Sequence, residues 1–401
     1  MFNQNKILKI SSKANYWLVR AGNKAEFYDD FQYNNFIAVG NNEILLSDLQ
    51  EIDSYSRISD DILEQQYKSI FFESFFSEYN KDESNKNKDK ATRQADLTSL
   101  RRSSGIAASK VFNFVEKMSI GDFIMLPNQG STKFLLGFIL SDAFDDEINH
   151  VKQEIILDDM SDTGYSISNF EKKRRVFWIK EFNNKDLPDK LSWIRQTRQT
   201  IYDLTSYAEQ INPLISANYI YKGDFYSRIG ITTVKPVSSL DLFQFQKLII
   251  DIAGDKSDKI HQKISIQSPG FSLLHTALEN WESIGIILAS LFGHVTFKKG
   301  GWSCEIKGVI PYFFSKTEKY LQQEKLRKEK LENDLKEVEV QKEKIELKTL
   351  ELNYKVESEN ISKKLKLTNS EVGNEVPIEM QMDNLSESEV LFEKEETPKR
   401  E

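Results

Sequence analysis

The sequence predicts an α+β protein with two folded units, a long charged helix and a disordered acidic tail. In the first half, short apolar runs bounded by glycine alternate with helix-periodic sequence. A smaller mixture of the same kind follows, and from residue 315 onward charged residues dominate. The 401 residues are enough for two domains of roughly 100–200 residues and a tail. Hydrophobic residues make up 39% of the chain, below the roughly 45–50% of a compact domain, so part of the chain must be solvated.

The first unit, residues 15–212, contains five runs typical of strands, because they are short, apolar or β-branched and bounded by turn residues. They are Tyr16–Arg20, Phe36–Val39, Phe123–Leu126, Phe134–Leu140 and Arg175–Ile179. The turn-rich stretch Pro127–Lys133 predicts a hairpin between the third and fourth runs. Residues 1–14 precede the unit as an N-terminal extension.

Two stretches between the second and third runs have different patterns. Apolar residues in Ile106–Lys117 recur at a helical period, which predicts a helix. Asn80–Lys90 is polar and of low complexity, with no apolar face to bury. We therefore expect residues 80–96 to form a mobile loop.

The second unit, residues 217–314, is predicted to be a small α+β domain. Its expected elements are an amphipathic helix, an alternating strand, a long apolar helix broken near Gly285, and a hairpin around a Lys-Lys-Gly-Gly turn. In chain order they cover Leu240–Ile252, Lys263–Gln267, Phe271–Phe292 and His294–Ile306.

Residues 315–366 predict a charged helix. One apolar seam of a heptad repeat is present, but its partner positions, such as Asp334, are polar. The seam consists of Leu331, Val338, Ile345 and Leu352. The helix is therefore either an adaptor to a protein partner or a solvated spacer. Residues 367–401 are acidic and polar, and we expect a disordered tail.

The composition argues against several classes of protein. The single cysteine, Cys304, excludes a disulfide framework, and the four histidines have no metal-ligand spacing, so we expect no metal and no cofactor. A net charge of −8 argues against a protein that coats nucleic acid by charge alone. The N-terminus lacks a signal-peptide pattern, and the apolar window Ser283–His294 is shorter than the roughly 20 residues of a membrane span. We therefore expect a cytoplasmic location and no membrane contact.

The order of the motifs in the first unit resembles that of a known family. The motifs are YWLVRAG from Tyr16, FIAVG from Phe36, FNFV from Phe112, IGDFIML from Ile120, FLLGFI from Phe134 and RVFW from Arg175. In this order they resemble the PUA-like, EVE-type domain at the N-terminus of Mrr-like modification-dependent restriction endonucleases. The resemblance covers about residues 15–210, and we recognise no nuclease half. It implies a small β-barrel that ends in a helix from about Leu187 to Tyr207 and holds a flipped or unpaired base in an aromatic-lined pocket.

This resemblance selects candidate site residues. The base pocket would consist of Trp17, Arg20, Gly22, Asn41 and Trp178, with the two tryptophans as aromatic walls and the arginine on a phosphate or base edge. Asn41 stands where the family usually has tryptophan. The basic run Lys172, Lys173, Arg174 and Arg175 is the candidate phosphate contact. Strand tryptophans are more often core residues than cage walls, and short charged runs often mark a solvated strand entry.

We therefore expect a non-catalytic protein that recognises nucleic acid, with a modified base as its target and DNA favoured over RNA. It would couple binding to a protein partner through residues 315–366, and the resemblance implies prokaryotic antiviral defence or restriction. Two alternatives stay open. One is a scaffold that assembles a complex through its C-terminal helix. The other is a divergent metal-dependent nuclease around Glu305 and Lys307, which needs Asp251 or Asp255 nearby.

Overall fold

The computed structural model is a mixed α+β structure of two compact units. It describes residues 4–53, 59–146, 164–265, 270–292, 295–299, 302–306, 355–369 and 372–376. The first unit consists of Lys13–Gln210 and the chain from Gly373 onward, and the second of Met1–Ser12 and Ile211–Val372. The chain therefore passes between the units three times, after residues 12, 210 and 372.

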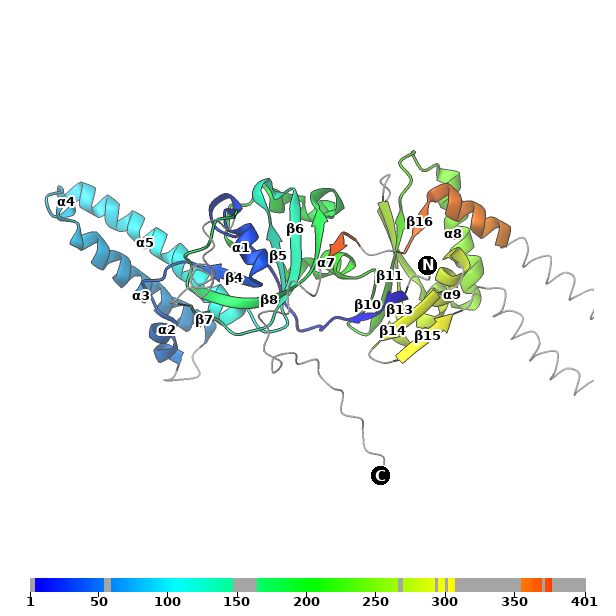
Figure 1. Cartoon of the computed structure of the whole chain (residues 1–401), viewed down its shortest axis with the longest axis horizontal. Helices are drawn as coiled ribbons and strands as arrows, with labels where there is room; N and C mark the ends of the chain where they lie inside the picture. The colour runs from blue at the N-terminus through cyan, green and yellow to red at the C-terminus, as the bar shows by residue number, and fades with distance from the viewer. Residues whose placement is uncertain are drawn as a thin grey trace, which may run out of the picture. The chain divides into compact units, whose positions relative to one another are not determined.

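The first unit is built on an eight-stranded sheet that curls into a half-barrel (Figure 1). The strand order is β17-β8-β6-β5-β3-β9, and β4 and β7 pair with the other part of β8. The strands are β3 (Tyr16–Val19), β4 (Phe36–Val39), β5 (Phe123–Pro127), β6 (Lys133–Ile139), β7 (Phe144–Asp145), β8 (Lys172–Asn183), β9 (Ile201–Asp203) and β17 (Asn374–Glu375). All five predicted strand runs and the β5–β6 hairpin are confirmed.

The ladder between β6 and β8 is irregular at Gly137. The register shifts between Leu136 and Gly137, which marks an irregularity in the ladder. A Cβ atom on Gly137 would lie 2.5 Å from the carbonyl oxygen of Phe177 and 2.7 Å from the Trp178 ring. Only glycine therefore lets the two strands approach this closely.

A helical hairpin projects from the half-barrel between β4 and β5 (Figure 1). At its base, Leu63, Tyr67 and Phe71 are buried together with Ala108 and Phe112. The helices of this part of the chain are α1 (Tyr28–Tyr33), α2 (Leu46–Asp53), α3 (Asp60–Lys81), α4 (Glu83–Lys86) and α5 (Lys90–Phe112), which continues as a π-helical turn over Asn113–Lys117. The predicted helix over 106–117 is thus confirmed.

The expectation of a mobile loop over residues 80–96 is wrong, because most of this stretch is helical. Two aspartates cap the N-termini of these helices, which lack an apolar face in the sequence. Asp82 accepts a hydrogen bond from the backbone of Ser84, and Asp89 accepts from Ala91 and Thr92. The expectation of one helix over 187–207 is also wrong. Two 3₁₀ helices (Asp189–Arg195 and Thr205–Tyr207) flank β9, which pairs with the edge of β3, and α7 (Ala208–Ile215) follows.

The second unit contains a six-stranded sheet with helices on one face (Figure 1). The strand order is β12-β13-β11-β10-β2, and β16 pairs with the end of β11. The elements are β2 (Leu8–Lys9), β10 (Asn218–Tyr221), β11 (Asp224–Ile231), α8 (Ser239–Ala253), β12 (His261–Ser265), β13 (Gly270–Ala277), α9 (Trp281–Phe292) and β16 (Leu367–Thr368). A three-stranded sheet joins β1 (Gln4–Lys6), β14 (Val295–Lys299) and β15 (Trp302–Ile306). The predicted helix at α8, the β12 strand and the β14–β15 hairpin are confirmed.

Two expectations for the rest of the chain, the long helix and the disordered tail, are corrected. Phe271–Phe292 is not one long helix: its first part is β13, which pairs along its whole length with β11, and α9 runs unbroken through Gly285. The N-terminal extension supplies β1 and β2. Within the predicted tail, residues 367–368 and 374–375 form β16 and β17. Residues 355–365 are helical, whereas 315–354 and 377–401, with the predicted heptad seam, lie outside the described residues.

We predict that Gly137→Ala lowers the free energy of unfolding by about 1–3 kcal/mol, because the added methyl group overpacks the β6–β8 contact. The control is Gly105→Ala in α5, where a Cβ atom meets nothing within 4 Å. That substitution is expected to stabilise the protein by about 0.4–1 kcal/mol. Urea denaturation followed by tryptophan fluorescence measures both changes. Equal effects of the two substitutions would contradict the close approach at Gly137.

Candidate functional site

The two tryptophans predicted to line a base pocket are core residues of the first unit. Trp17 is 4% exposed, and its Nε1 donates to Asp122 Oδ2 at 3.0 Å. Trp178 is fully buried, and its Nε1 donates to the carbonyl oxygen of Phe31 at 3.1 Å. A base would reach either ring only after this core opened.

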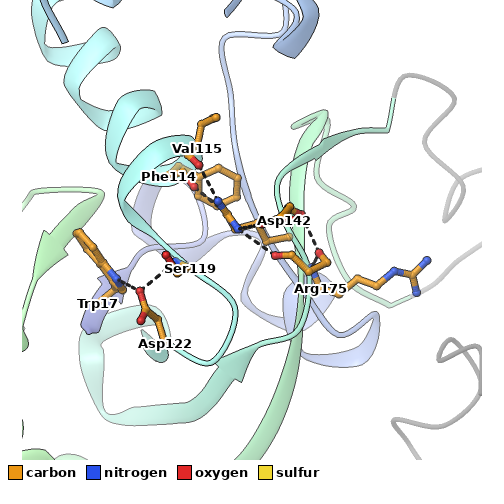
Figure 2. A network of polar contacts seen from close by, with 9 residues as sticks. Trp17, Phe114, Val115, Ser119, Asp122, Asp142 and Arg175 are labelled. Atoms are coloured by element: carbon orange, nitrogen blue, oxygen red, sulfur yellow. Dashed lines mark hydrogen bonds and ion pairs between the residues drawn. The ribbon is translucent and has the colours of Figure 1, made fainter. Parts of the chain in front are cut away.

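Asp122 is the centre of a buried polar network next to β5 (Figure 2). Its Oδ2 accepts from Trp17 Nε1 and from the backbone N–H of Ser119, and its Oδ1 accepts from the backbone N–H of Asn15 at 2.8 Å. These bonds connect the start of β3 with the turn that precedes β5. The arrangement holds two neighbouring strands together and explains why a carboxylate is buried here.

The basic run Lys172–Arg175 does not form a basic surface. Lys172, Lys173 and Arg174 are at most 3% exposed, and each is bound within the protein. Lys172 Nζ donates to the carbonyl oxygen of Asn41 at 2.9 Å, and Lys173 Nζ lies 2.6 Å from Asp146 Oδ2. The prediction of a phosphate contact is therefore corrected for these three cations, which are structural. Strands β4 and β7 pair with β8 over this stretch, and the three side chains are buried there.

The Arg174 guanidinium shows how completely such a cation is enclosed. It donates to the carbonyl oxygens of Phe114, Val115 and Ser141 at 2.7–2.9 Å. Figure 2 shows Phe114, Val115 and Asp142 converging on this point. Burial lowers the pKa of Arg174, and it also lowers the pKa of Lys172. Only Arg175 of the run is half-buried, with its guanidinium 6.0 Å from the centre of the Phe144 ring.

The other three predicted pocket residues are engaged in separate contacts. Arg20 is half-buried, and its Nη2 donates to the carbonyl oxygen of Ile194 at 2.8 Å. Gly22 has a φ of +77°, which makes it a turn residue. Asn41 also has a positive φ, and its Oδ1 accepts from Lys110 Nζ at 3.0 Å.

In the second unit, one face of the β12-β13-β11-β10 sheet carries polar and aromatic side chains. On the other face, Phe225, Ile229 and Leu274 belong to the core that includes α8 and α9. Strand alternation therefore directs Tyr226, Arg228 and their cross-strand neighbours away from these helices. We call this the ring face; its members are Tyr219, Tyr221, Asp224, Tyr226, Arg228, His261, Lys263, Phe271, Leu273 and His275.

A stack of four rings crosses the ring face. Tyr219, Tyr226, His275 and His261 occupy matching positions on four adjacent strands. Successive ring centres are 4.8, 5.0 and 5.0 Å apart, with planes inclined by 5°, 17° and 32°. Exposure increases along the stack, from 1% at Tyr219 to the exposed His261. Because β12 is the edge strand of the described sheet, the outer face of the His261 ring has no strand beside it.

Two cations flank this stack on one side and a carboxylate on the other. Arg228 and Lys263 both lie opposite Leu273. Each is two residues along its strand from a ring of the stack. The Arg228 guanidinium lies over the Phe271 ring at 4.9 Å, a cation–π contact that holds it in place. On the other side, Asp224 Oδ2 lies 3.5 Å from His275 Nδ1.

The two histidines have different environments. His261 is exposed, whereas the His275 side chain is 17% exposed between His261 and Tyr226. Burial lowers the pKa of His275 below 6.5, and the neighbouring His261 lowers it further, although Asp224 acts in the opposite direction. This shift favours the neutral form of the His275 imidazole. The ring combines an aromatic surface with a nitrogen that accepts protons.

The ring face was not predicted, because the apolar run Phe271–Phe292 indicated a helix where β13 lies. The detectable signal was the alternation of Phe271, Leu273 and His275, together with His261 and Lys263 two residues apart on the neighbouring strand. In β13 both alternating sets contain a leucine, so the two-residue period is masked.

The described residues of the alternative metal-dependent nuclease lie on three different elements. Glu305 lies on β15, Asp251 in α8 and Asp255 in a 3₁₀ helix, while Lys307 lies outside the described residues. Within the part of the chain that the structure describes, no three histidine, cysteine, aspartate or glutamate side chains are grouped so that they could hold a metal ion. Over the same residues, we find no helix with the length and apolar character needed to cross a membrane.

Comparison with known proteins adds no relative. A scan against protein-family models finds no matching family, and searches among curated proteins and among solved structures find no match. The resemblance of residues 15–210 to PUA-like domains therefore stays a prediction from the motifs.

We predict that Lys173→Met lowers the free energy of unfolding by about 3–5 kcal/mol, because it leaves Asp146 buried without its cation. Urea denaturation measures the loss. The control, Lys190→Met at an exposed position, should change stability by less than about 0.5 kcal/mol. An unchanged stability of Lys173→Met, combined with weaker nucleic-acid binding, would restore the predicted phosphate contact.

A second prediction concerns pH. The folded-state pKa of His275 lies below the unfolded value of 6.5, so the unfolded chain binds more protons between the two values. This residue therefore destabilises the protein as pH falls through about 6.5 towards the folded-state pKa. Denaturation at about pH 7.5 and about pH 5.5 should show a larger loss for the wild type than for His275→Gln. A His275 resonance titrating above 6.5 in NMR spectra would contradict the sign.

Proposed function

We propose that this protein binds single-stranded nucleic acid on the ring face of its second unit. The observation that carries the proposal is the four-ring stack that ends in exposed His261. Two cations, Arg228 and Lys263, lie two residues along the strands from these rings. Stacking platforms combined with basic side chains are the recurring physical solution for binding unpaired bases.

The ring face offers a candidate contact for each part of such a ligand. A base that continues the stack on the outer face of His261 gains about 1–3 kcal/mol, as base–aromatic stacking does in general. Lys263, which is exposed on the same strand, and Arg228 are placed to contact phosphates beside the stacked base. A duplex hides its base faces in its own stack, so the ring face favours single strands.

The acidic character of the whole chain agrees with this mode of binding. A net charge of −8 weakens long-range attraction of polyanions, so affinity must come from local contacts. Asp224 adds local repulsion at one end of the stack, which directs the phosphate chain to the side of Arg228 and Lys263.

The first unit is proposed to serve the same class of ligand. The order of its motifs supports a PUA-like barrel that reads a modified base in DNA, and residues 315–366 would then join recognition to a protein partner in prokaryotic defence. With Trp17 and Trp178 in the core, such a pocket needs other walls than those two rings.

The test is fluorescence anisotropy of the full-length protein with labelled single- and double-stranded DNA and RNA of one sequence, at two ionic strengths. Single strands should bind more tightly than duplexes. His261→Ala should weaken binding by about 1–3 kcal/mol, roughly 5- to 150-fold. Lys263→Gln should reduce the dependence of log affinity on log salt by about 0.7.

Exposed Lys190→Gln on the first unit is the matched control and should leave both quantities unchanged. Binding that is equally strong in wild type and His261→Ala would remove the ring face as the site. A methylated duplex arm tests the first unit separately: preference for that duplex, retained in His261→Ala, would assign base reading to the half-barrel.

A further inference from the structure

We infer that the ring face also cleaves single-stranded RNA, with His275 as general base and His261 as general acid. This inference rests on the proposed function, because the strand must first lie across the ring face. It adds an activity and selects RNA as the substrate.

The first observation is the placement of the two imidazoles side by side. His261 and His275 are directly paired on β12 and β13, and their ring centres are 5.0 Å apart. Both side chains rise from the same face of the sheet, so one phosphodiester group lying across that face meets both rings. In the proposed complex one imidazole meets the ribose 2′-hydroxyl and the other the 5′ oxygen of the next nucleotide, each within the roughly 2.6–3.2 Å needed for proton transfer.

The second observation is that the two environments are unequal. Asp224 Oδ2 lies 3.5 Å from His275 Nδ1, which is buried and makes no hydrogen bond within the described structure. In the proposed reaction this carboxylate holds the proton at Nδ1, so that Nε2 acts as the base. Such contacts are often long before the substrate binds. His261 is exposed on the edge strand β12, and the proposed reaction uses it as the acid. Two titratable groups in contrasting environments are the usual arrangement for an acid–base pair.

The third observation is the set of charges around the pair. On β11, Asp224 and Arg228 are the charged groups of the ring face, and Tyr226 packs against His275; on β12 the charged neighbour is Lys263. Arg228 and Lys263 stand on the same side of the stack. They are placed to stabilise the negative charge that grows on the phosphate oxygens in the transition state.

The reaction is an internal transesterification. His275 Nε2 removes the proton of the ribose 2′-hydroxyl, and the 2′ oxygen forms a bond to phosphorus. The bond from phosphorus to the 5′ oxygen of the next nucleotide breaks, and that oxygen takes the proton of the His261 imidazolium. The products are a 2′,3′-cyclic phosphate and a 5′-hydroxyl end, and proton exchange with water restores both histidines. DNA lacks the 2′-hydroxyl nucleophile and is bound but not cleaved.

The test incubates the full-length protein with end-labelled single-stranded RNA, and with DNA of the same sequence, in the presence of EDTA. Products are separated by electrophoresis, and the cyclic phosphate is identified by mass spectrometry. The wild type should cleave RNA alone, with a bell-shaped dependence on pH. His261→Gln and His275→Gln, purified in the same way, should each lose on the order of 10²- to 10⁴-fold in rate.

Asp224→Asn tests the positioning role of this carboxylate, since it should displace the limb of the pH profile that belongs to His275, whereas a purely structural role would leave the profile unmoved. His294→Gln is the histidine control and should cleave at the wild-type rate. Urea denaturation confirms that the variants are folded. Wild type that binds RNA without cleaving it, or variants that cleave as fast as wild type, would overturn the inference while the binding function stands. If neither strand binds, the proposed function fails as well.

Discussion

Three consecutive buried cations on β8 are the constraint on which the first unit depends. Each buried charge costs several kcal/mol in lost hydration unless it is paired and hydrogen-bonded. Lys173 pairs with the buried carboxylate of Asp146, whereas Arg174 donates hydrogen bonds to carbonyl oxygens at the end of the helical hairpin. The hairpin, the half-barrel and the strand that joins them are therefore held by one set of contacts, which form only when all three are in place. Arg174 connects the fold of the sheet with the position of the hairpin.

The second unit follows a simpler plan with a different outcome. Its helices cover one face of an antiparallel sheet, and the strand alternation that buries Phe225 and Ile229 directs Tyr226 and Arg228 to the other face. The ring stack is a consequence of register, because a shift of one residue in β13 would move His275 into the core and Leu274 onto the ring face. The segment 367–369 contributes to this register. Its Asn369 Nδ2 donates to the Ser227 hydroxyl and to the carbonyl oxygen of Arg228, from inside the unit.

The two units thus use basic residues in opposite ways. In the first unit, three of the four cations of one sequence run are buried and bound within the protein. In the second, Arg228 and Lys263 are far apart in the sequence but are brought to the same side of one row of rings. Aromatic and cationic groups gathered in this way, on one face of a sheet, are suited to unpaired bases and their phosphates. In the proposed reaction, Asp224 and the second histidine add acid–base chemistry to this surface.

The sequence alone determined the positions of the short strands in the first unit, because runs such as Phe36–Val39 are bounded by turn residues and their pattern is local. It also located α8 and the β14–β15 hairpin, where period and turn chemistry agree. Tertiary structure decided the rest. The tip of the hairpin is helical although it lacks an apolar face, because aspartate caps and the partner helix stabilise it. Likewise, β13 is a strand because β11 pairs with it along its length. The local sequence also does not determine whether a charged run is exposed. Lys172–Arg174 are buried because β4 and β7, which come from distant parts of the chain, pair with this stretch of β8. The ring face arises in the same way, because cross-strand register is a long-range property that no single segment carries.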